Sequence, residues 1–245
     1  MNLLEVQGLR KTYPAFRLED VSFSVPEGAV MGLIGRNGAG KSTTLKSILG
    51  LVHPDAGRVE MFGRDFSENE RYIKENIGVV LGGIDFYPKK KVRTITDVTR
   101  RFYSNWQEEK YRHYLDLFAI DENKRVDQLS SGMRVKYLLA LALSHNARLL
   151  ILDEPTSGLD PVSRDELAEL LRRIAADGTR SVLFSTHITS DLEKCASHIT
   201  FIQEGRLQRS DTLAGFMAHY ADLGSTLEEI IVAAERRPYD ADAII

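Results

Sequence analysis

Short apolar runs separated by polar turns open the chain. They cover residues 3–7, 21–25 and 30–35. In each run the apolar side chains either alternate with polar ones or follow one another without a break, as they do in strands. A glycine-rich stretch comes next, and then Leu45, Ile48 and Leu49 lie on one face of a helical period. This part of the chain therefore predicts three strands, a loop and a helix.

The middle of the chain changes from strand to helix periodicity. Residues 57–63 alternate like a strand, and the uninterrupted apolar run at 77–81 is typical of a strand buried on both faces. Beyond it, apolar residues recur every three or four positions in three segments. The segments are TITDVTRRFY (94–103), EEKYRHYLDLF (108–118) and MRVKYLLALALSHN (133–146). We expect residues 83–144 to form a helical insertion.

Strand-like runs return in the last third of the chain. They are LLIL (149–152), SVLFS (181–185) and ITFIQ (199–203). The helical segment at 161–178 has Pro161 near its start and Gly178 beyond its end, the usual positions of these residues around a helix. Strands alternating with helices predict the α/β class, with a parallel sheet covered by helices on both faces. After about residue 211 we expect two modest amphipathic helices and a loosely ordered polar end.

Composition narrows the function without defining it. The 245 residues include 32 Lys and Arg against 35 Asp and Glu, a net charge of −3 that argues against a broad nucleic-acid-binding face. The single cysteine, Cys195, permits no internal disulfide and is expected to be a buried apolar residue on a helix. The start lacks the pattern of a signal peptide, and apolar runs such as 137–143 are too short to span a bilayer. We therefore expect a cytoplasmic protein whose membrane role, if any, comes through a partner.

A phosphate-binding loop occupies residues 35–42. Its sequence, GRNGAGKS, matches G-x-x-x-x-G-K-[ST] and lies between an apolar strand and a helix, as that motif requires. Glycines let backbone N–H groups turn toward phosphate oxygens, and the helix N-terminus adds positive potential there. Lys41 is expected to contact the β- and γ-phosphates, and Ser42 to hold Mg²⁺. A glycine-rich turn that merely contains Gly-Lys-Ser is the structural alternative.

Two carboxylates follow the strand at 149–152. Ligands of open α/β sheets bind beyond the carboxyl ends of strands, which is where Asp153 and Glu154 lie. Successive residues of an extended chain point in opposite directions, so the two can have different roles. We expect Asp153 to hold Mg²⁺ and Glu154 to act as general base on the attacking water. An Asp-Glu pair that simply ends a strand is the alternative.

Taken in order, these motifs resemble the nucleotide-binding domain of ABC transporters. Residues 35–42 match its Walker A loop and 149–154 its Walker B strand with the catalytic glutamate. SGLD (157–160) matches the D-loop, STH (185–187) the switch-histidine segment, and LSSGM (129–133) stands where the signature LSGGQ belongs. The resemblance covers about residues 3 to 210, and the signature and D-loop make it specific, because other P-loop NTPases lack them.

The resemblance implies a fold and a residue set. The fold is a P-loop NTPase with a RecA-like parallel sheet core, an antiparallel β subdomain and an inserted α-helical subdomain at about 83–144. The ATPase domain would be residues 1–215, followed by a short C-terminal helical tail, 216–245. His187 would contact the γ-phosphate, and Tyr13 would stack on adenine, with Phe16 as a second candidate. The full set of expected ATP-binding residues is Tyr13, Asn37, Gly38, Gly40, Lys41, Ser42, Thr43, Ser130, Gly132 and Asp160.

Two positions depart from the family pattern. LSSGM keeps Ser130 and Gly132 for the γ-phosphate, while Ser131 adds a side chain that needs room and Met133 loses the polar contacts of glutamine. This form looks like the ABC-2-type exporter branch. At the position of the family's Q-loop glutamine the chain has Gly82, which cannot coordinate Mg²⁺ or position water. Asp85 could substitute only if the intervening glycines let the loop fold back.

The resemblance also implies a mechanism and partners. The signature helix would complete the ATP site of a second subunit, so ATP would close a homodimer, or a heterodimer with another ABC ATPase, and hydrolysis would open it. The dimer would drive export through a separate integral-membrane permease from the inner face of the cell membrane, without nucleic acid. Two alternatives stay open: a non-transport ABC ATPase acting on DNA or the ribosome, and an ATP-sensing regulatory module with weak hydrolysis.

Overall fold

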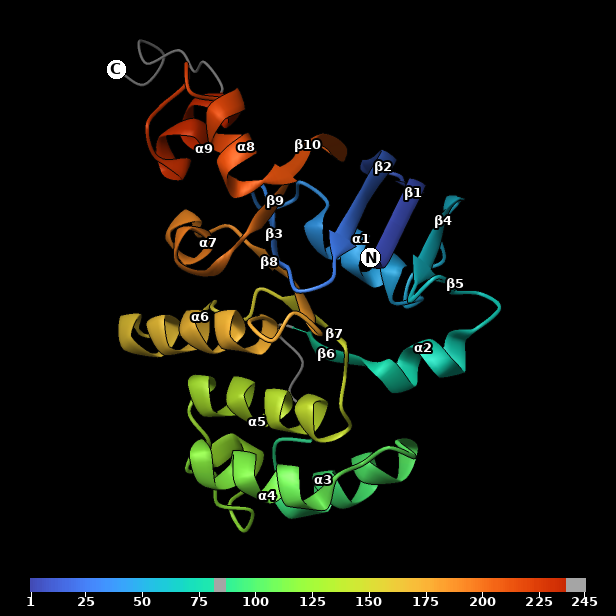
Figure 1. Ribbon diagram of the computed structural model, residues 1–245, viewed down its shortest axis with the longest axis vertical. Coiled ribbons are helices and arrows are strands. Elements are labelled where there is room, and N and C mark those ends of the chain that lie inside the picture. The colour runs from blue at the N-terminus through green and yellow to red at the C-terminus, as the bar shows by residue number, and fades with distance from the viewer. Residues whose placement is uncertain (82–86, 237–245) are drawn as a thin grey trace.

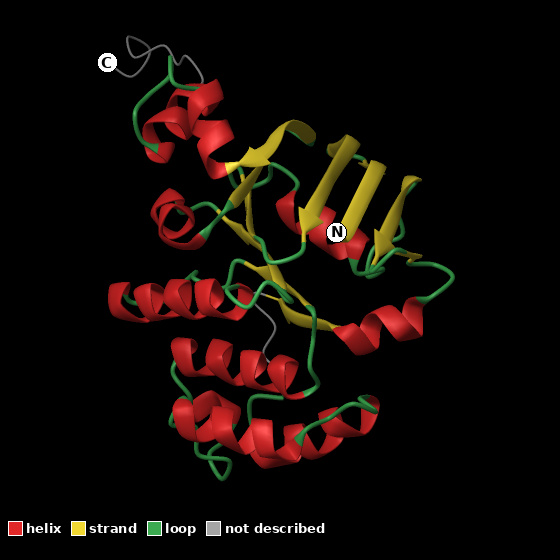
Figure 2. Cartoon of the chain, viewed as in Figure 1, coloured by secondary structure: helices red, strands yellow, loops and turns green. Residues whose placement is uncertain are grey.

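One curled sheet organises the fold (Figures 1 and 2). The computed structural model describes residues 1–81 and 87–236, and over these the sheet has ten strands in the order β5-β4-β1-β2-β10-β9-β3-β8-β7-β6. The strands are β1 (Asn2–Tyr13), β2 (Phe16–Pro26), β3 (Val30–Ile34), β4 (Ala56–Met61), β5 (Arg64–Asp65), β6 (Ile77–Leu81), β7 (Leu149–Asp153), β8 (Ser181–Thr186), β9 (His198–Gln203) and β10 (Arg206–Thr212).

The sheet is parallel at one end and antiparallel at the other. Strands β9, β3, β8, β7 and β6 pair in parallel, and they carry the uninterrupted apolar runs expected of strands covered on both sides. Strands β5, β4, β1 and β2 pair antiparallel. This arrangement confirms the predicted parallel core with an antiparallel β subdomain.

The helices of the described residues either cover the two faces of the parallel core or belong to the helical insertion. They are α1 (Lys41–Ile48), α2 (Glu70–Asn76), α3 (Val92–Thr99), η1 (Arg100–Phe102), α4 (Glu108–Leu117), η2 (Val126–Gln128), α5 (Ser131–Ser144), α6 (Pro161–Ala175), α7 (Thr189–Cys195), α8 (Leu213–His219) and α9 (Leu227–Glu235). Two hydrophobic cores lie on opposite sides of the parallel strands, and alternate residues of β7 contribute to each. Leu149 and Ile151 pack with α1, whereas Leu150 and Leu152 pack with α5 and α6.

The helical insertion forms a separate small core. Helices α3, α4 and α5 gather at one end of the molecule, away from α1 (Figure 1). Helix α5 belongs to both regions, because Tyr137 and Leu141 pack within the insertion while Leu139 and Leu143 pack against the sheet. The helices of the insertion thus run from Val92 to Ser144, inside the predicted 83–144.

Strand β10 was not predicted, and its composition explains why. Its sequence, RLQRSDT, has one apolar residue, Leu207, so no alternating pattern marks it. It pairs antiparallel with β9 and touches β2 through the single pair Arg206–Glu19. A polar strand can hold this place because it joins the two halves of a curled sheet rather than lying inside a core.

The remaining expectations have mixed outcomes. Two helices, α8 and α9, follow residue 211 as predicted, and Cys195 is buried at the end of α7, where burial raises the pKa of its thiol to about 12. The polar end at 237–245 lies outside the described residues. None of the helices within 1–81 and 87–236 has the length and apolar character needed to cross a bilayer.

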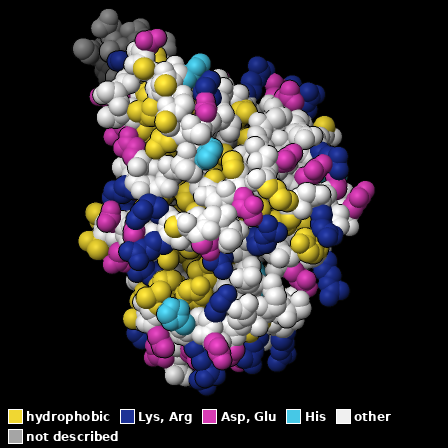
Figure 3. Space-filling model, in the orientation of Figure 1, with side chains coloured by type: hydrophobic (Ala, Val, Ile, Leu, Met, Phe, Trp, Pro, Cys, Tyr) yellow, Lys and Arg dark blue, Asp and Glu magenta, His cyan; other side chains and the backbone are white. Residues whose placement is uncertain are grey.

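On the face shown in Figure 3, Lys and Arg side chains are interspersed with Asp and Glu rather than gathered into one basic surface.

Candidate functional site

The phosphate-binding loop connects β3 to α1 at the carboxyl end of the parallel strands. Gly40, the last residue before α1, has a φ of 112°, and a Cβ there would lie 2.8 Å from Cζ of Phe16. Only glycine combines that backbone with that close approach. Asn37 and Gly38 are exposed at the tip of the loop, whereas Lys41 is only 5% exposed. The loop thus offers an open turn in front of a buried cation and a helix N-terminus.

Lys41 is fully engaged by its own chain. Its Nζ donates to the carbonyl oxygens of Gly35 (2.7 Å) and Arg36 (3.2 Å). It also forms an ion pair with Oε1 of Glu154 at 3.4 Å. A lysine this deeply buried needs such partners to keep its charge. The expected phosphate-binding cation and the expected general base therefore lie in direct contact.

Ser42 and Asp153 meet beside this pair. The Ser42 hydroxyl donates to Oδ1 of Asp153 at 3.1 Å, and the Ser185 hydroxyl donates to the same oxygen at 2.6 Å. Having given its only hydrogen to Asp153, Ser42 keeps its lone pairs for a cation. A hydroxyl and a carboxylate are the oxygen ligands that Mg²⁺ takes when phosphates and water complete its shell. The two residues therefore fit the predicted metal site.

Glu154 does not continue the strand. Its backbone is left-handed, with a φ of 50°, and its N–H donates to the carbonyl oxygen and the hydroxyl of Ser185. The expectation of an extended Asp-Glu pair is therefore wrong at its second residue, because this turn ends β7 at Asp153. The side chains still face different partners: Asp153 faces Ser42, whereas Glu154 faces Lys41 and Nδ1 of His187 at 2.9 Å.

We call Lys41, Ser42, Asp153, Glu154 and His187 the phosphate cluster. They come from α1, the end of β7 and the segment after β8, and hydrogen bonds or ion pairs connect them into two neighbouring groups. No role of its own was predicted for Ser185, yet its hydroxyl donates to Asp153 and its hydroxyl and carbonyl oxygens accept from the N–H of Glu154. The available signal was a polar residue at the end of the apolar run of β8, beside β7 in the sheet.

The expected adenine platform lies at the hairpin between β1 and β2. Tyr13 is 39% exposed, and Nζ of Lys11 lies 5.8 Å from the centre of its ring. Phe16 pairs with Tyr13 across the hairpin and places its ring tip against Gly40. Thr43, the third residue of α1, is partly buried. Both aromatic candidates thus lie on the hairpin, and Phe16 is the one that touches the loop.

A second group of predicted residues gathers at the starts of α5 and α6. Ser130 caps α5 by accepting from the N–H of Met133, and the Ser131 hydroxyl donates to the carbonyl oxygen of Gly158 at 3.2 Å. A Cβ on Gly132 would lie 3.2 Å from Oγ of Ser163. We call Ser130, Ser131, Gly132, Gly158 and Asp160 the signature cluster. The side chain of Ser131 has the room it needs and uses it to join the signature to the D-loop.

Asp160 has a clear local role in this cluster. It caps α6 by accepting from the N–H groups of Val162 and Ser163, and from the Ser163 hydroxyl. These hydrogen bonds, with that of the hydroxyl foremost, hold the pKa of the Asp160 carboxyl below its usual value. An exposed, ionised carboxylate therefore stands at the end of the D-loop.

The two clusters remain apart within the chain. Across residues 1–81 and 87–236, no hydrogen bond or ion pair joins Ser130, Gly132 or Asp160 to a member of the phosphate cluster. Gly82 and Asp85, on which the Q-loop expectation rests, lie outside the described residues.

Comparison with known proteins agrees with this geometry. The model of the ABC transporter family matches residues 18–157. The bacitracin transport ATP-binding protein BcrA of Bacillus licheniformis is 32% identical over 208 residues, which cover 84% of this chain and 68% of that protein. The Nod factor export ATP-binding protein I of Burkholderia orbicola (strain AU 1054) is 39% identical over 191 residues, or 76% of this chain and 62% of that protein. The chain thus spans about two thirds of the length of these relatives.

Solved structures share the fold. The structure of an ATP-binding subunit of an ABC transporter superposes with a TM-score of 0.84 at 28% identity, covering 96% of this chain and all of that one. A dimeric ATP-binding cassette bound to ADP and phosphate gives a TM-score of 0.75 at 21% identity, over 86% and 98% of the two chains.

The parallel core, the phosphate loop and the carboxylates at the strand ends define a P-loop ATPase. Within that class, the chain belongs to the ABC transporter family, where it is of the ATP-binding, ATP-hydrolysing type.

Proposed function

We propose that this chain powers export through a separate membrane permease by hydrolysing ATP in a dimer. The observation that carries the proposal is that Glu154 contacts both Lys41 (3.4 Å) and His187 (2.9 Å), the residues proposed as base, phosphate-binding cation and second γ-phosphate ligand, respectively. The name of one relative, Nod factor export ATP-binding protein I, supports the direction of transport.

Each residue of the phosphate cluster has a proposed role. Backbone N–H groups of Asn37, Gly38, Gly40 and Thr43 surround the phosphates, and Lys41 moves from its carbonyl partners to the β- and γ-phosphates. When bound, Mg²⁺ supplies charge neutralisation to the phosphates. Ser42 would hold it through its hydroxyl oxygen, and Asp153, which accepts the Ser42 hydrogen, would offer a carboxylate oxygen. Tyr13 supports the adenine from the hairpin.

Glu154 is the proposed base. In the structure its two carboxylate oxygens are engaged by Lys41 and His187. Once Lys41 shifts to the phosphates, Oε1 of Glu154 is released to accept a proton from the attacking water. His187 stays next to Glu154 and faces the γ-phosphate. The Lys41 contact thus keeps Oε1 of the base occupied without ATP, and its loss frees that oxygen when ATP binds.

The signature cluster serves a second subunit in this proposal. Ser130 and Gly132 carry a hydroxyl and an N–H group at the start of α5, and Asp160 carries a carboxylate at the start of α6. Among the described residues, none of the three forms a hydrogen bond or ion pair with the phosphate cluster of its own chain. We propose that they close over the γ-phosphate bound by the partner, in a homodimer or a heterodimer. The assembly is then peripheral to the inner face of the membrane, and the helical insertion contacts the permease.

The E154Q variant tests the assignment. It preserves size and polarity but removes the basic carboxylate, so ATP should still bind and dimerise the chain, while turnover falls at least about 100-fold. Steady-state hydrolysis, equilibrium binding of labelled ATP and sedimentation with ATP measure the three properties. The exposed Glu109 provides a control, since E109Q should leave all three unchanged.

Two results would contradict the proposal. Undiminished turnover in E154Q would remove Glu154 as base. Wild-type protein that binds ATP and hardly hydrolyses it, even together with a permease, would favour the ATP-sensing alternative.

A further inference from the structure

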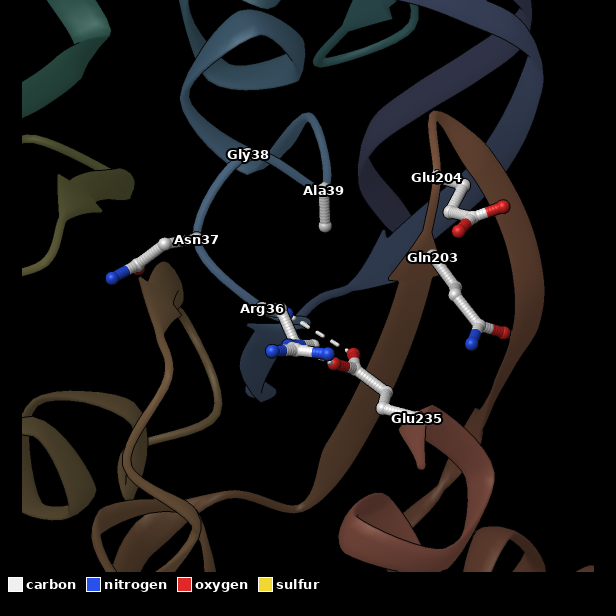
Figure 4. Close-up of a pocket in the computed structure, with 7 residues that line it drawn as sticks. All are labelled: Arg36, Asn37, Gly38, Ala39, Gln203, Glu204 and Glu235. Atoms are coloured by element: carbon white, nitrogen blue, oxygen red, sulfur yellow. Dashed lines mark hydrogen bonds and ion pairs between the residues drawn. The ribbon is translucent and has the colours of Figure 1, made fainter. Parts of the chain in front are cut away.

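The end of helix α9 lies against the first turn of the phosphate loop, far along the chain from it (Figure 4). The N–H of Arg36 donates to Oε1 of Glu235 at 3.0 Å, and Nε of Arg36 lies 3.6 Å from Oε2. The Glu235 side chain is only 5% exposed. A carboxylate shielded from water in this way makes a stronger hydrogen bond to a backbone N–H than an exposed one does.

The position of Glu235 is fixed by the docking of its helix. Leu227 and Ile230 of α9 are fully buried in the core cluster that also contains Leu192 of α7, and the N–H of Leu227 donates to Glu193 of α7 at 2.9 Å. At the other end of the helix, the Gln203 amide donates to the carbonyl oxygen of Ala234 at 3.1 Å. Helix α9 therefore brings the carboxylate to the loop as part of a rigid element.

Glu235 borders a small cavity without filling it. The cavity, of about 300 Å³, lies between the loop residues 36–39, the turn at Gln203 and Glu204, and Glu235. In Figure 4, Arg36 and Glu235 point toward each other, whereas Asn37 points away from them. Glu235 thus reaches the base of the loop and leaves its tip open.

Arg36 is consequently held from two sides. Glu235 holds its N–H, and Nζ of Lys41 holds its carbonyl oxygen. If Lys41 shifts to the phosphates, as the proposed function requires, the carbonyl loses this partner and the N–H keeps its own. The carbonyl still accepts from the N–H of Ala39 at 3.0 Å, and the Glu235 carboxylate, on the preceding peptide, is the side-chain contact of the Arg36 backbone that remains.

We infer that Glu235 is a positioning residue for ATP binding, which fixes the first turn of the phosphate loop through the Arg36 N–H. The inference rests on the proposed role of residues 35–42. It connects the C-terminal helix to the affinity for ATP and gives that helix no part in the chemical step.

The test compares E235A, E235Q and a control from the same helix. Glu228 is exposed on α9, so E228A removes an equal charge without touching the loop. E235A should raise the KM for ATP about tenfold, the effect of losing one charge-assisted hydrogen bond, with kcat within about twofold of wild type. E235Q, whose amide oxygen can still accept from Arg36, should lie between E235A and wild type, and E228A should match wild type.

Hydrogen exchange supplies a readout that does not depend on activity. In the nucleotide-free protein, the amide of Arg36 should exchange faster in E235A than in wild type or E228A, at temperatures where all three remain folded. An unchanged KM and unchanged exchange in folded E235A would overturn the inference. A lower KM would do so as well, because it would mean that the carboxylate repels the triphosphate.

The K41A variant separates this inference from the proposed function. Loss of ATP binding in K41A together with an unchanged E235A would leave the proposed function standing and refute only the role of Glu235. Intact ATP binding in K41A would instead refute the phosphate loop itself.

Discussion

The phosphate cluster and the signature cluster differ in how far the chain completes them. In the first, buried Lys41 and Asp153 have partners inside the chain, down to hydroxyl and carbonyl oxygens. In the second, Ser130 and Asp160 are exposed, and their hydrogen bonds only cap their own helices. In the phosphate cluster a ligand must therefore compete with contacts that the chain already makes. In the signature cluster the polar groups are open to contact from a second molecule.

Mixed dimers give the strongest test of this difference. K41A or S130A alone should reduce ATP turnover at least about 100-fold, since each removes a phosphate ligand from both sites. A mixture of the two variants forms dimers in which one site carries both changes and the other carries neither. In an equimolar mixture about half of the dimers are of this mixed kind, and each has one intact site of two, so turnover should recover toward about a quarter of the wild-type value.

Two controls bound the experiment. The exposed Lys46 on the same helix as Lys41 serves as a matched substitution, and K46A should behave as wild type. A mixture no more active than the single variants would show that each chain completes its own site, and the contrast between the clusters would lose its meaning.

Acid should weaken the attachment of the helical insertion. His145 ends α5, is 2% exposed and stacks on Tyr103 with ring centres 3.7 Å apart. Burial lowers its pKa to about 4, from 6.5 in the unfolded chain. The unfolded state therefore binds the proton first, so stability is complete above pH 6.5 and falls as the pH drops toward 4. Between pH 7.5 and 5 the loss is about 2 kcal/mol.

The H145F variant isolates the contribution of His145 to the pH dependence of stability, because phenylalanine keeps the stacked ring and cannot titrate. Urea unfolding at pH 7.5 and pH 5 should show a drop in wild type that is about 2 kcal/mol larger than in H145F. H53F, at an exposed histidine, should keep the wild-type drop. Equal drops in wild type and H145F would contradict the argument.

The Ser131 hydroxyl gives the smallest expected effect. It makes one exposed hydrogen bond to the D-loop, worth about 1 kcal/mol at most, so S131A should lower turnover a few-fold and leave the KM for ATP unchanged. The exposed Ser104 of the same insertion provides the control variant S104A. Wild-type turnover in S131A would mean that the two partner-facing segments keep their alignment without this bond.

The contrast between the clusters also explains what could be predicted from the sequence. Lys41, Ser42 and Asp153 belong to motifs whose flanking strands and helices have strong apolar periodicity, so their common location followed from the order of elements. The turn at Glu154 could not be predicted, because it depends on Ser185 from a neighbouring strand. Strand β10 and the Arg36–Glu235 contact could not be predicted for the same reason, because each depends on residues that are distant in the sequence.

At Glu154, the residue type that would best stabilise the fold differs from the residue type that supplies a carboxylate. A non-glycine residue in this conformation costs about 1–2 kcal/mol, and glycine would avoid most of that cost. The residue with the lowest conformational cost at this position, glycine, thus has no carboxylate. Selection for stability alone would favour glycine at position 154, so, if Glu154 is the base that we propose, the protein has a slightly less stable fold in exchange for turnover.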